Sequence, residues 1–121
     1  MELVFYMGLI STFLITRFLT HKLHNKKNYN SNTLTGLIRR KSNFDFHHIH
    51  FGIIILFILL FLNFFFVINL ILNYIFYAIS LSLIADQLFP LLKIYDYFER
   101  KSIIVAIILH LIIIIIFKLN F

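Results

Sequence analysis

The stretch from Phe44 to Leu62 reads FDFHHIHFGIIILFILLFL, and it places three histidines at the start of a long apolar run. The hydrocarbon core of a bilayer is about 30 Å thick, and a helix needs roughly 20 apolar residues to cross it. Because the apolar run continues to Ile68, residues 44–68 are predicted to form a membrane-spanning helix with the histidines at one end. Ionisable side chains at a membrane boundary are costly to desolvate, so these histidines are candidates for function.

The composition of the whole chain is typical of a membrane protein. Of its 121 residues, 61% are hydrophobic and 13% are charged, whereas a soluble domain is about 45–50% apolar and about 25% charged. A chain of this length could not bury so much Ile, Leu and Phe in a water-soluble core. It has no cysteine, which excludes disulfides, thiolate metal sites and cysteine nucleophiles.

Three further segments are apolar enough to cross a bilayer. Residues 3–20 form the first, and Arg17 near their end could extend to the lipid headgroups. Residues 74–92, which contain Asp86, form the third span, and residues 97–118 form the fourth. The sequence therefore predicts an all-α, single-domain membrane protein built as a four-helix transmembrane bundle. Three spans, with residues 3–20 lying along the membrane interface, are the alternative.

Basic residues mark two connections of this predicted bundle. They lie in the loop 21–42 and between the third and fourth helices: Lys22, Lys26, Lys27, Arg39, Arg40 and Lys41, then Lys93, Arg100 and Lys101. An even number of crossings separates the two connections, so both face the same side of the membrane. The positive-inside rule assigns that side to the cytoplasm, or to the matrix of an organelle, and places both termini outside. We therefore expect a cell or organelle inner membrane and a preference for anionic lipid, and no nucleic-acid partner.

The histidines and one carboxylate are predicted to meet at the cytoplasmic face. His47 and His50 are three residues apart and share a helical face, whereas His48 points about 100° away. Such a pair can bind one metal ion, and Asp86 from the neighbouring helix could complete the site. Imidazole with carboxylate suits zinc, iron or manganese. We predict a divalent metal held by His47, His50 and Asp86, with His48 and Asp96 supporting these ligands or carrying protons.

These polar residues also have structural explanations. Histidines at a membrane interface can bond headgroups or neighbouring backbone. Pro90 has no N–H, so it leaves the carbonyl of Asp86 without its helical partner, and this free acceptor would suit a cation or a water. Alternatively, Asp86 pairs with Arg100 or Lys101 at a kinked helix end.

Two patterns predict helix starts, and two residues predict contacts between helices. Asp96-x-x-Glu99 resembles a capping box that would begin the fourth helix near Tyr97. Ser42-x-x-Asp45 fits the same pattern before the second helix. His110 and Asn63 lie within apolar spans, where such side chains usually bond a neighbouring helix.

The segment from Leu83 to Ser102, LIADQLFPLLKIYDYFERKS, resembles a family of small, uncharacterised prokaryotic integral membrane proteins. The corresponding stretch of that family reads approximately Leu-Asp-Glu-Phe-Ala-Leu-Trp-Leu, then Asp-Val-Tyr-Trp, then Arg-x-Ser. The ten-residue interval from Asp86 to Asp96 matches, as does the histidine stretch 47–52. This chain has Gln87 where the family has a second acidic residue. The resemblance covers roughly residues 43–106, and it implies a fold and no activity.

Two functions follow from these observations, and the sequence leaves both open. The first is a small integral membrane protein with a His/Asp metal site at the cytoplasmic face, serving a hydrolytic or lipid-modifying reaction. The second is a non-enzymatic accessory or structural subunit. Its partners would be other membrane subunits or a second copy of the chain, in addition to the lipid bilayer.

Overall fold

The computed structural model describes residues 1–25, 48–92, 94 and 97–120, and the elements within these ranges are all helices. They are α1 (Glu2–Asn25), α3 (His48–Phe65), α4 (Leu70–Leu91) and α5 (Arg100–Asn120). Each contains a stretch long and apolar enough to cross a membrane. The predicted all-α protein with four spans, including the N-terminal one, is therefore confirmed.

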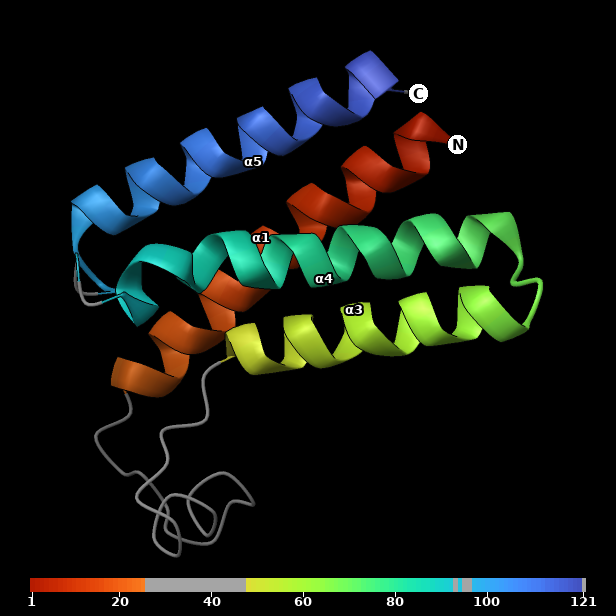
Figure 1. Ribbon diagram of the computed structural model, residues 1–121. Helices are drawn as coiled ribbons and strands as arrows, with labels where there is room; N and C mark the ends of the chain where they lie inside the picture. Colours follow the sequence, from red (N-terminus) through yellow and green to blue (C-terminus); the bar gives the residue numbers. More distant parts are fainter. Residues whose placement is uncertain (26–47, 93, 95–96, 121) are drawn as a thin grey trace, which may run out of the picture.

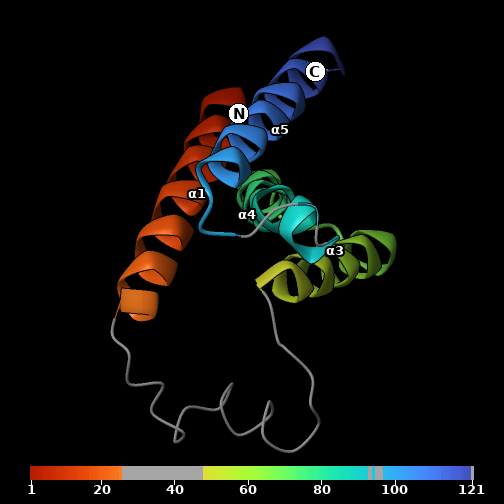
Figure 2. The ribbon, with the colours of Figure 1, turned by 90° about the vertical axis from the view of Figure 1, so that its left-hand side faces the viewer.

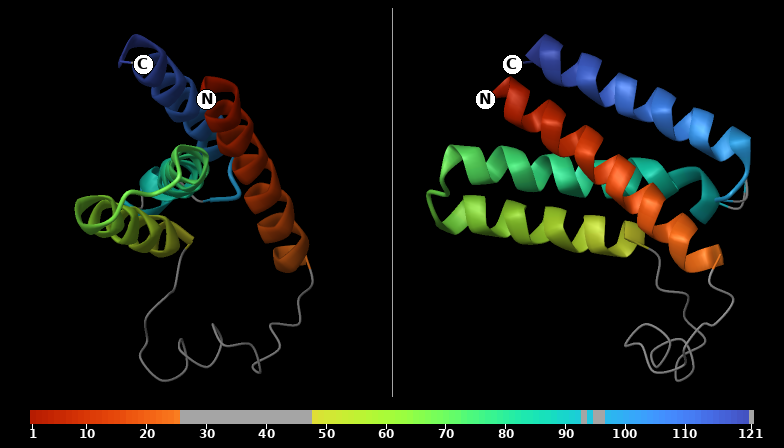
Figure 3. Two further views of the ribbon diagram at one scale, coloured as in Figure 1. Left: turned by 90° about the vertical axis from the view of Figure 1, so that its right-hand side faces the viewer. Right: turned by 180° about the vertical axis from the view of Figure 1, so that it is seen from behind.

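The other three described helices, α1, α3 and α5, all pack on α4 (Figure 1). Among the described helices, the backbone of α3 approaches only α4, and α1 and α5 meet over a short length (Figure 2). The helices α3 and α4 form an antiparallel hairpin, and α1 crosses α4 obliquely (Figure 3). Both chain termini lie at the end of the bundle that carries the α3–α4 turn. The two basic connections therefore leave the opposite end together, as the crossing count predicts.

The outer surface of the bundle is apolar, whereas its buried core is small. Phe57 and Phe64 on α3 are 69% and 82% exposed, and large aliphatic residues cover the outer faces of α1 and α5 in the same way. Phe5, Leu9 and Ala78 form the buried core between α1 and α4. In water such a surface would favour aggregation, so hydrocarbon is the solvent that suits it.

Small residues allow the backbones to approach closely in the interior of the bundle. A Cβ atom at Gly52 of α3 would lie 2.8 Å from the backbone oxygen of Ser80 on α4. A Cβ atom at Gly8 of α1 would lie 3.1 Å from the Cβ of Ala78. Van der Waals packing drives the association of helices within a bilayer, and close approach increases it.

The turn between α3 and α4 lies earlier than predicted. The predicted third helix begins at residue 74 after a turn at 69–73, but α4 begins at Leu70. The Asn69 side chain accepts a hydrogen bond from the Ile71 backbone N–H at 2.9 Å and so caps the helix. Asn73 lies inside α4, where its amide and that of Asn63 exchange two hydrogen bonds of 2.9 and 2.7 Å. The expected interhelical contact of Asn63 is confirmed.

The start of the last helix also differs from its prediction. It begins at Arg100 rather than near Tyr97. The Glu99 carbonyl accepts from the backbone N–H groups of Ser102 at 3.0 Å and Ile103 at 3.4 Å, so Glu99 precedes the helix. The capping box with Glu99 in the first turn is therefore wrong. Asp96 and the Ser42-x-x-Asp45 pattern lie outside the described residues.

Candidate functional site

The carboxylate of Asp86, in the last turns of α4, is the centre of a buried polar cluster and is 1% exposed. Its Oδ1 accepts a hydrogen bond from Arg17 Nε at 2.5 Å. Its Oδ2 accepts from the Tyr97 hydroxyl at 2.8 Å and lies 3.0 Å from His48 Nε2. One carboxylate thus connects α1, α3, α4 and the turn before α5.

Arg17 joins this cluster instead of extending to the headgroups, so that prediction is wrong. Its Nη1 donates to the Tyr97 carbonyl at 2.7 Å, and its Nη2 lies 3.3 Å from the Ser102 hydroxyl. The guanidinium carbon also lies 4.0 Å from the centroid of the Tyr97 ring, within the range of cation–π attraction. Without a counter-ion the buried Asp86 would be left as an uncompensated charge, and Arg17 is the counter-ion that the fold supplies.

Pro90 contributes to this arrangement in the way its chemistry predicts. It lies in the last turn of α4 and cannot donate to the Asp86 carbonyl. Arg17 Nη2 lies 3.5 Å from that carbonyl oxygen, so the cation near the free acceptor is an arginine of the same chain. The alternative pairing of Asp86 with Arg100 or Lys101 is wrong, since both of those residues are exposed and Arg17 is the recorded partner.

His48, the first described residue after the basic loop, hydrogen-bonds to Asp86. His48 is the first residue of α3, and its side chain is 19% exposed. A carboxylate oxygen only accepts, so neutral His48 carries its hydrogen on Nε2 and keeps a lone pair on Nδ1. The structure records no hydrogen bond to that Nδ1 within the described part of the chain. His48 therefore presents a ligating or basic nitrogen whose tautomer is set by Asp86.

The predicted metal site is only partly covered by the structure. His47 and Asp96 lie outside the described residues, and His50 is half-buried on α3. Within the described ranges, no three side chains of the types His, Cys, Asp and Glu converge closely enough to hold a metal ion. The site formed by His47, His50 and Asp86 stays a prediction.

Tyr97 lies in the turn before α5 and is 8% exposed. Burial raises the pKa of its phenol above the usual value of about 10, and the negative charge of Asp86 raises it further. The hydroxyl therefore remains a donor to the carboxylate throughout the physiological pH range.

A second polar contact lies nearer the middle of the bundle. His110 Nε2 on α5 lies 2.9 Å from the Ser82 hydroxyl on α4, and His110 Nδ1 lies 2.7 Å from the Ala106 carbonyl. The carbonyl fixes the hydrogen of neutral His110 on Nδ1, and the single hydroxyl hydrogen of Ser82 is shared between His110 Nε2 and the Leu9 carbonyl, which lies 3.1 Å from the same oxygen. The prediction that His110 bonds a neighbouring helix is confirmed.

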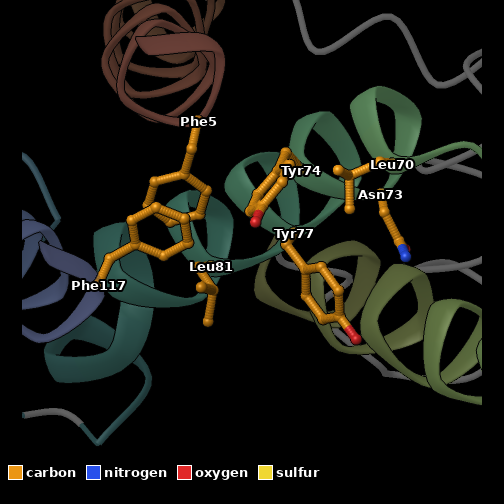
Figure 4. Close-up of a pocket in the computed structure, with 7 residues that line it drawn as sticks. All are labelled: Phe5, Leu70, Asn73, Tyr74, Tyr77, Leu81 and Phe117. Atoms are coloured by element: carbon orange, nitrogen blue, oxygen red, sulfur yellow. The ribbon is translucent and has the colours of Figure 1, made fainter. Parts of the chain in front are cut away.

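The half of the bundle that carries the termini contains a cavity of about 380 Å³ between α1, α4 and α5. Figure 4 shows its lining, in which the rings of Phe5 and Phe117 stack with centroids 3.9 Å apart. The remaining lining residues come from α4 and are Leu70, Asn73, Tyr74, Tyr77 and Leu81. The lining has no acidic, basic or imidazole group, so the candidate chemistry lies at the Asp86 cluster.

Three members of that cluster were not found from the sequence: Arg17, Tyr97 and Ser102. Arg17 had a detectable signal, because it is the only charged residue in 3–20 and Asp86 is the only charged residue in 74–92. Two lone charges of opposite sign within apolar spans favour pairing. Tyr97 and Ser102 had no such signal, since their positions depend on where the last helix begins.

Comparisons with protein families, curated proteins and solved structures give no match to this chain, so the interpretation of the site rests on its own geometry.

Proposed function

We propose that this protein is a small integral membrane protein that binds a divalent metal through His48 at the end of the bundle from which the basic loop departs. The observation that carries the proposal is the hydrogen bond from His48 Nε2 to the buried Asp86 carboxylate. Histidines that ligate metals nearly always donate their other ring N–H to a carboxylate, a carbonyl or a water. The lone pair left on His48 Nδ1 is then the ligating atom.

This proposal changes the roles of two residues in the predicted site. Asp86 orients His48 instead of ligating the metal, because both carboxylate oxygens already accept hydrogen bonds. His48 becomes a ligand instead of a support. His47 and His50 remain the predicted additional ligands, and zinc, iron and manganese remain the predicted metals.

Hydrolysis or modification of a lipid is the reaction class that we propose for this site. A divalent metal supplies an activated water at neutral pH and polarises an ester or phosphoryl oxygen. The site lies at the end of an apolar bundle, where lipid headgroups are the nearest substrates. We place this end on the cytoplasmic or matrix side, because the basic residues gather there.

One observation favours the accessory-subunit alternative. Among the described helices, α3 approaches only α4 with its backbone, and its outer face exposes Phe57, Phe61 and Phe64. Such a face could pack on another membrane subunit or on a second copy. That function would need no metal, so metal binding discriminates between the two proposals.

The experiment is a metal titration of the full chain in lipid nanodiscs, with Co²⁺ as an absorbing probe and Zn²⁺ as competitor. We expect wild type to bind about one metal per chain, and His48→Ala to weaken binding at least about tenfold. His21→Ala is the matched control. His21 is an exposed histidine near the C-terminal end of α1, at the same end of the bundle as His48. His48→Gln retains an N–H donor for Asp86 and replaces the imidazole nitrogen with an amide oxygen, a weaker ligand for zinc and cobalt, so it separates weakened ligation from loss of folding. Equal binding by wild type and His48→Gln would contradict the proposal.

A further inference from the structure

Among the described residues, two buried side-chain polar atoms have no hydrogen-bond partner, the Tyr6 hydroxyl and Oε1 of Gln87, and Gln87 is the one that directly follows Asp86 in the sequence. It is 5% exposed, and its Oε1 has no partner among the described residues. The other buried polar side chains all have partners, and these are Ser80, Ser82, Asp86, Ser102 and His110. Because nearly all buried polar groups in proteins are paired, an unpaired buried amide needs an explanation.

The position of Gln87 on α4 places it beside the start of α3. Ser80 and Ile84 face Gly52 of α3, as the close contacts of a Cβ built at Gly52 show. Gln87 follows Ile84 by three residues and so lies on the same face of the helix, one turn nearer the end of α4. Because α3 runs antiparallel to α4, that turn is level with the first residues of α3, which include His48. Gln87 also directly follows Asp86, to which His48 is hydrogen-bonded.

We propose that Gln87 Oε1 is a second ligand of the metal that His48 binds, and this inference rests on the proposed function. Imidazole nitrogen and amide oxygen each offer a lone pair, and neither His48 Nδ1 nor Gln87 Oε1 has a recorded donor within the described residues. A divalent cation is the ligand class that would satisfy two acceptors placed on facing turns of neighbouring helices. The burial of Gln87 without a partner is then a cost in stability that the bound metal removes.

The electrostatics of the cluster predict how substitutions of Gln87 act. Asp86 is already paired with Arg17, so the two proposed ligands bring no net charge to the metal. Gln87→Glu would add a carboxylate of nearly the same size and should therefore bind the metal more tightly. Gln87→Leu keeps the bulk and removes both the proposed ligand and the unpaired amide oxygen. It should weaken metal binding and raise the thermal stability of the metal-free protein.

The test compares Gln87→Leu and Gln87→Glu with wild type by Co²⁺ and Zn²⁺ titration and by thermal unfolding with and without metal. Asn63→Leu is the matched control, an amide-to-leucine change at the far end of α3 that breaks the pair with Asn73. We expect at least about tenfold weaker binding for Gln87→Leu, tighter binding for Gln87→Glu, and unchanged binding for Asn63→Leu. The metal-free melting temperature should rise for Gln87→Leu and fall for Asn63→Leu.

The outcomes distinguish this inference from the proposed function. If wild type binds metal, His48→Gln loses it and Gln87→Leu retains full affinity, then Gln87 is not a ligand and the His48 site stands. If wild type binds no metal, both proposals are wrong. A fall in the metal-free melting temperature of Gln87→Leu would show that the amide has a stabilising partner, and this result would also overturn the inference.

Discussion

Asp86 is held by donors from α1, from α3 and from the turn before α5, and Arg17 balances its charge. Removing one partner of a buried ion pair costs about 3–5 kcal/mol, because the other charge is left uncompensated. We therefore expect Asp86→Asn to destabilise the bundle by about this amount in reversible unfolding with mixed detergent micelles. The control Glu99→Gln changes an exposed side chain and should shift the free energy of unfolding by less than about 0.5 kcal/mol.

The double variant Arg17→Gln with Asp86→Asn tests whether the pair acts as a unit. Two neutral side chains can still hydrogen-bond, so the double variant should lose less free energy than the two single changes added together. Strict additivity would mean that the charges do not interact in the folded protein.

The raised pKa of Tyr97 gives a prediction about alkaline conditions. A folded-state pKa above the unfolded value of about 10 means that the neutral phenol is stabilised by the fold. This contribution is complete below pH 10 and is lost as the pH rises through the folded-state value. The stability difference between wild type and Tyr97→Phe should therefore be constant up to about pH 10 and shrink above it. Unfolding curves of both proteins from pH 7 to 11.5 measure this, and a difference that changes below pH 9 would contradict it.

The sequence is enough to predict that Asp86 needs a partner within the membrane, but it is not enough to predict which residue that partner is. A lone carboxylate in an apolar span must be neutralised by something. However, Arg17 is 69 residues away in the sequence. The sequence alone does not show which face of α1 is turned toward α4. An arginine near the end of a span is explained equally well by contact with headgroups. The same uncertainty in helix rotation explains why the sequence predicts only a supporting role for His48, although His48 contacts Asp86 directly.

At the scale of single elements, the apolar length of each segment is enough to predict its helix. The ends depend on individual side chains. Asn-rich residues suggest a turn, yet Asn69 caps α4 and Asn73 bonds Asn63 from within the helix. The residue type is the same in both cases. Asn73 differs from Asn69 in its contact with Asn63 on the neighbouring helix, which the sequence does not show.

The α3–α4 hairpin depends on close approach at Gly52. Alanine there would place its Cβ 2.8 Å from a backbone oxygen, which no side-chain rotation can relieve. We expect Gly52→Ala to cost about 1–3 kcal/mol through overpacking, although alanine favours a helix over glycine by up to about 1 kcal/mol. In Gly8→Ala the new Cβ would lie 3.1 Å from the methyl group of Ala78. Adding Ala78→Gly to this variant should relieve that close contact. Detergent unfolding of the three variants checks this, and a stabilised Gly52→Ala would contradict the contact.

At the scale of the whole molecule, α4 gives the bundle its connectivity. It contacts α1, α3 and α5 and supplies Asp86 to the polar cluster. The number of crossings predicted that the basic connections share one end of the bundle, and the fold agrees. The central place of α4 could not be predicted, because all four segments have similar apolar patterns and only packing distinguishes them.

This central place affects the order in which the protein can be assembled. Arg17 and Asp86 are 69 positions apart, so at about 5–20 residues per second the arginine is made about 3.5–14 s before its counter-ion. The sequence of α3, made in between, contains no acidic residue. Until α4 leaves the ribosome, Arg17 lacks the counter-ion of the folded bundle, and lipid headgroups are the groups within its reach that can balance its charge. The first helix to be synthesised therefore forms its buried ion pair only after α4 has been made.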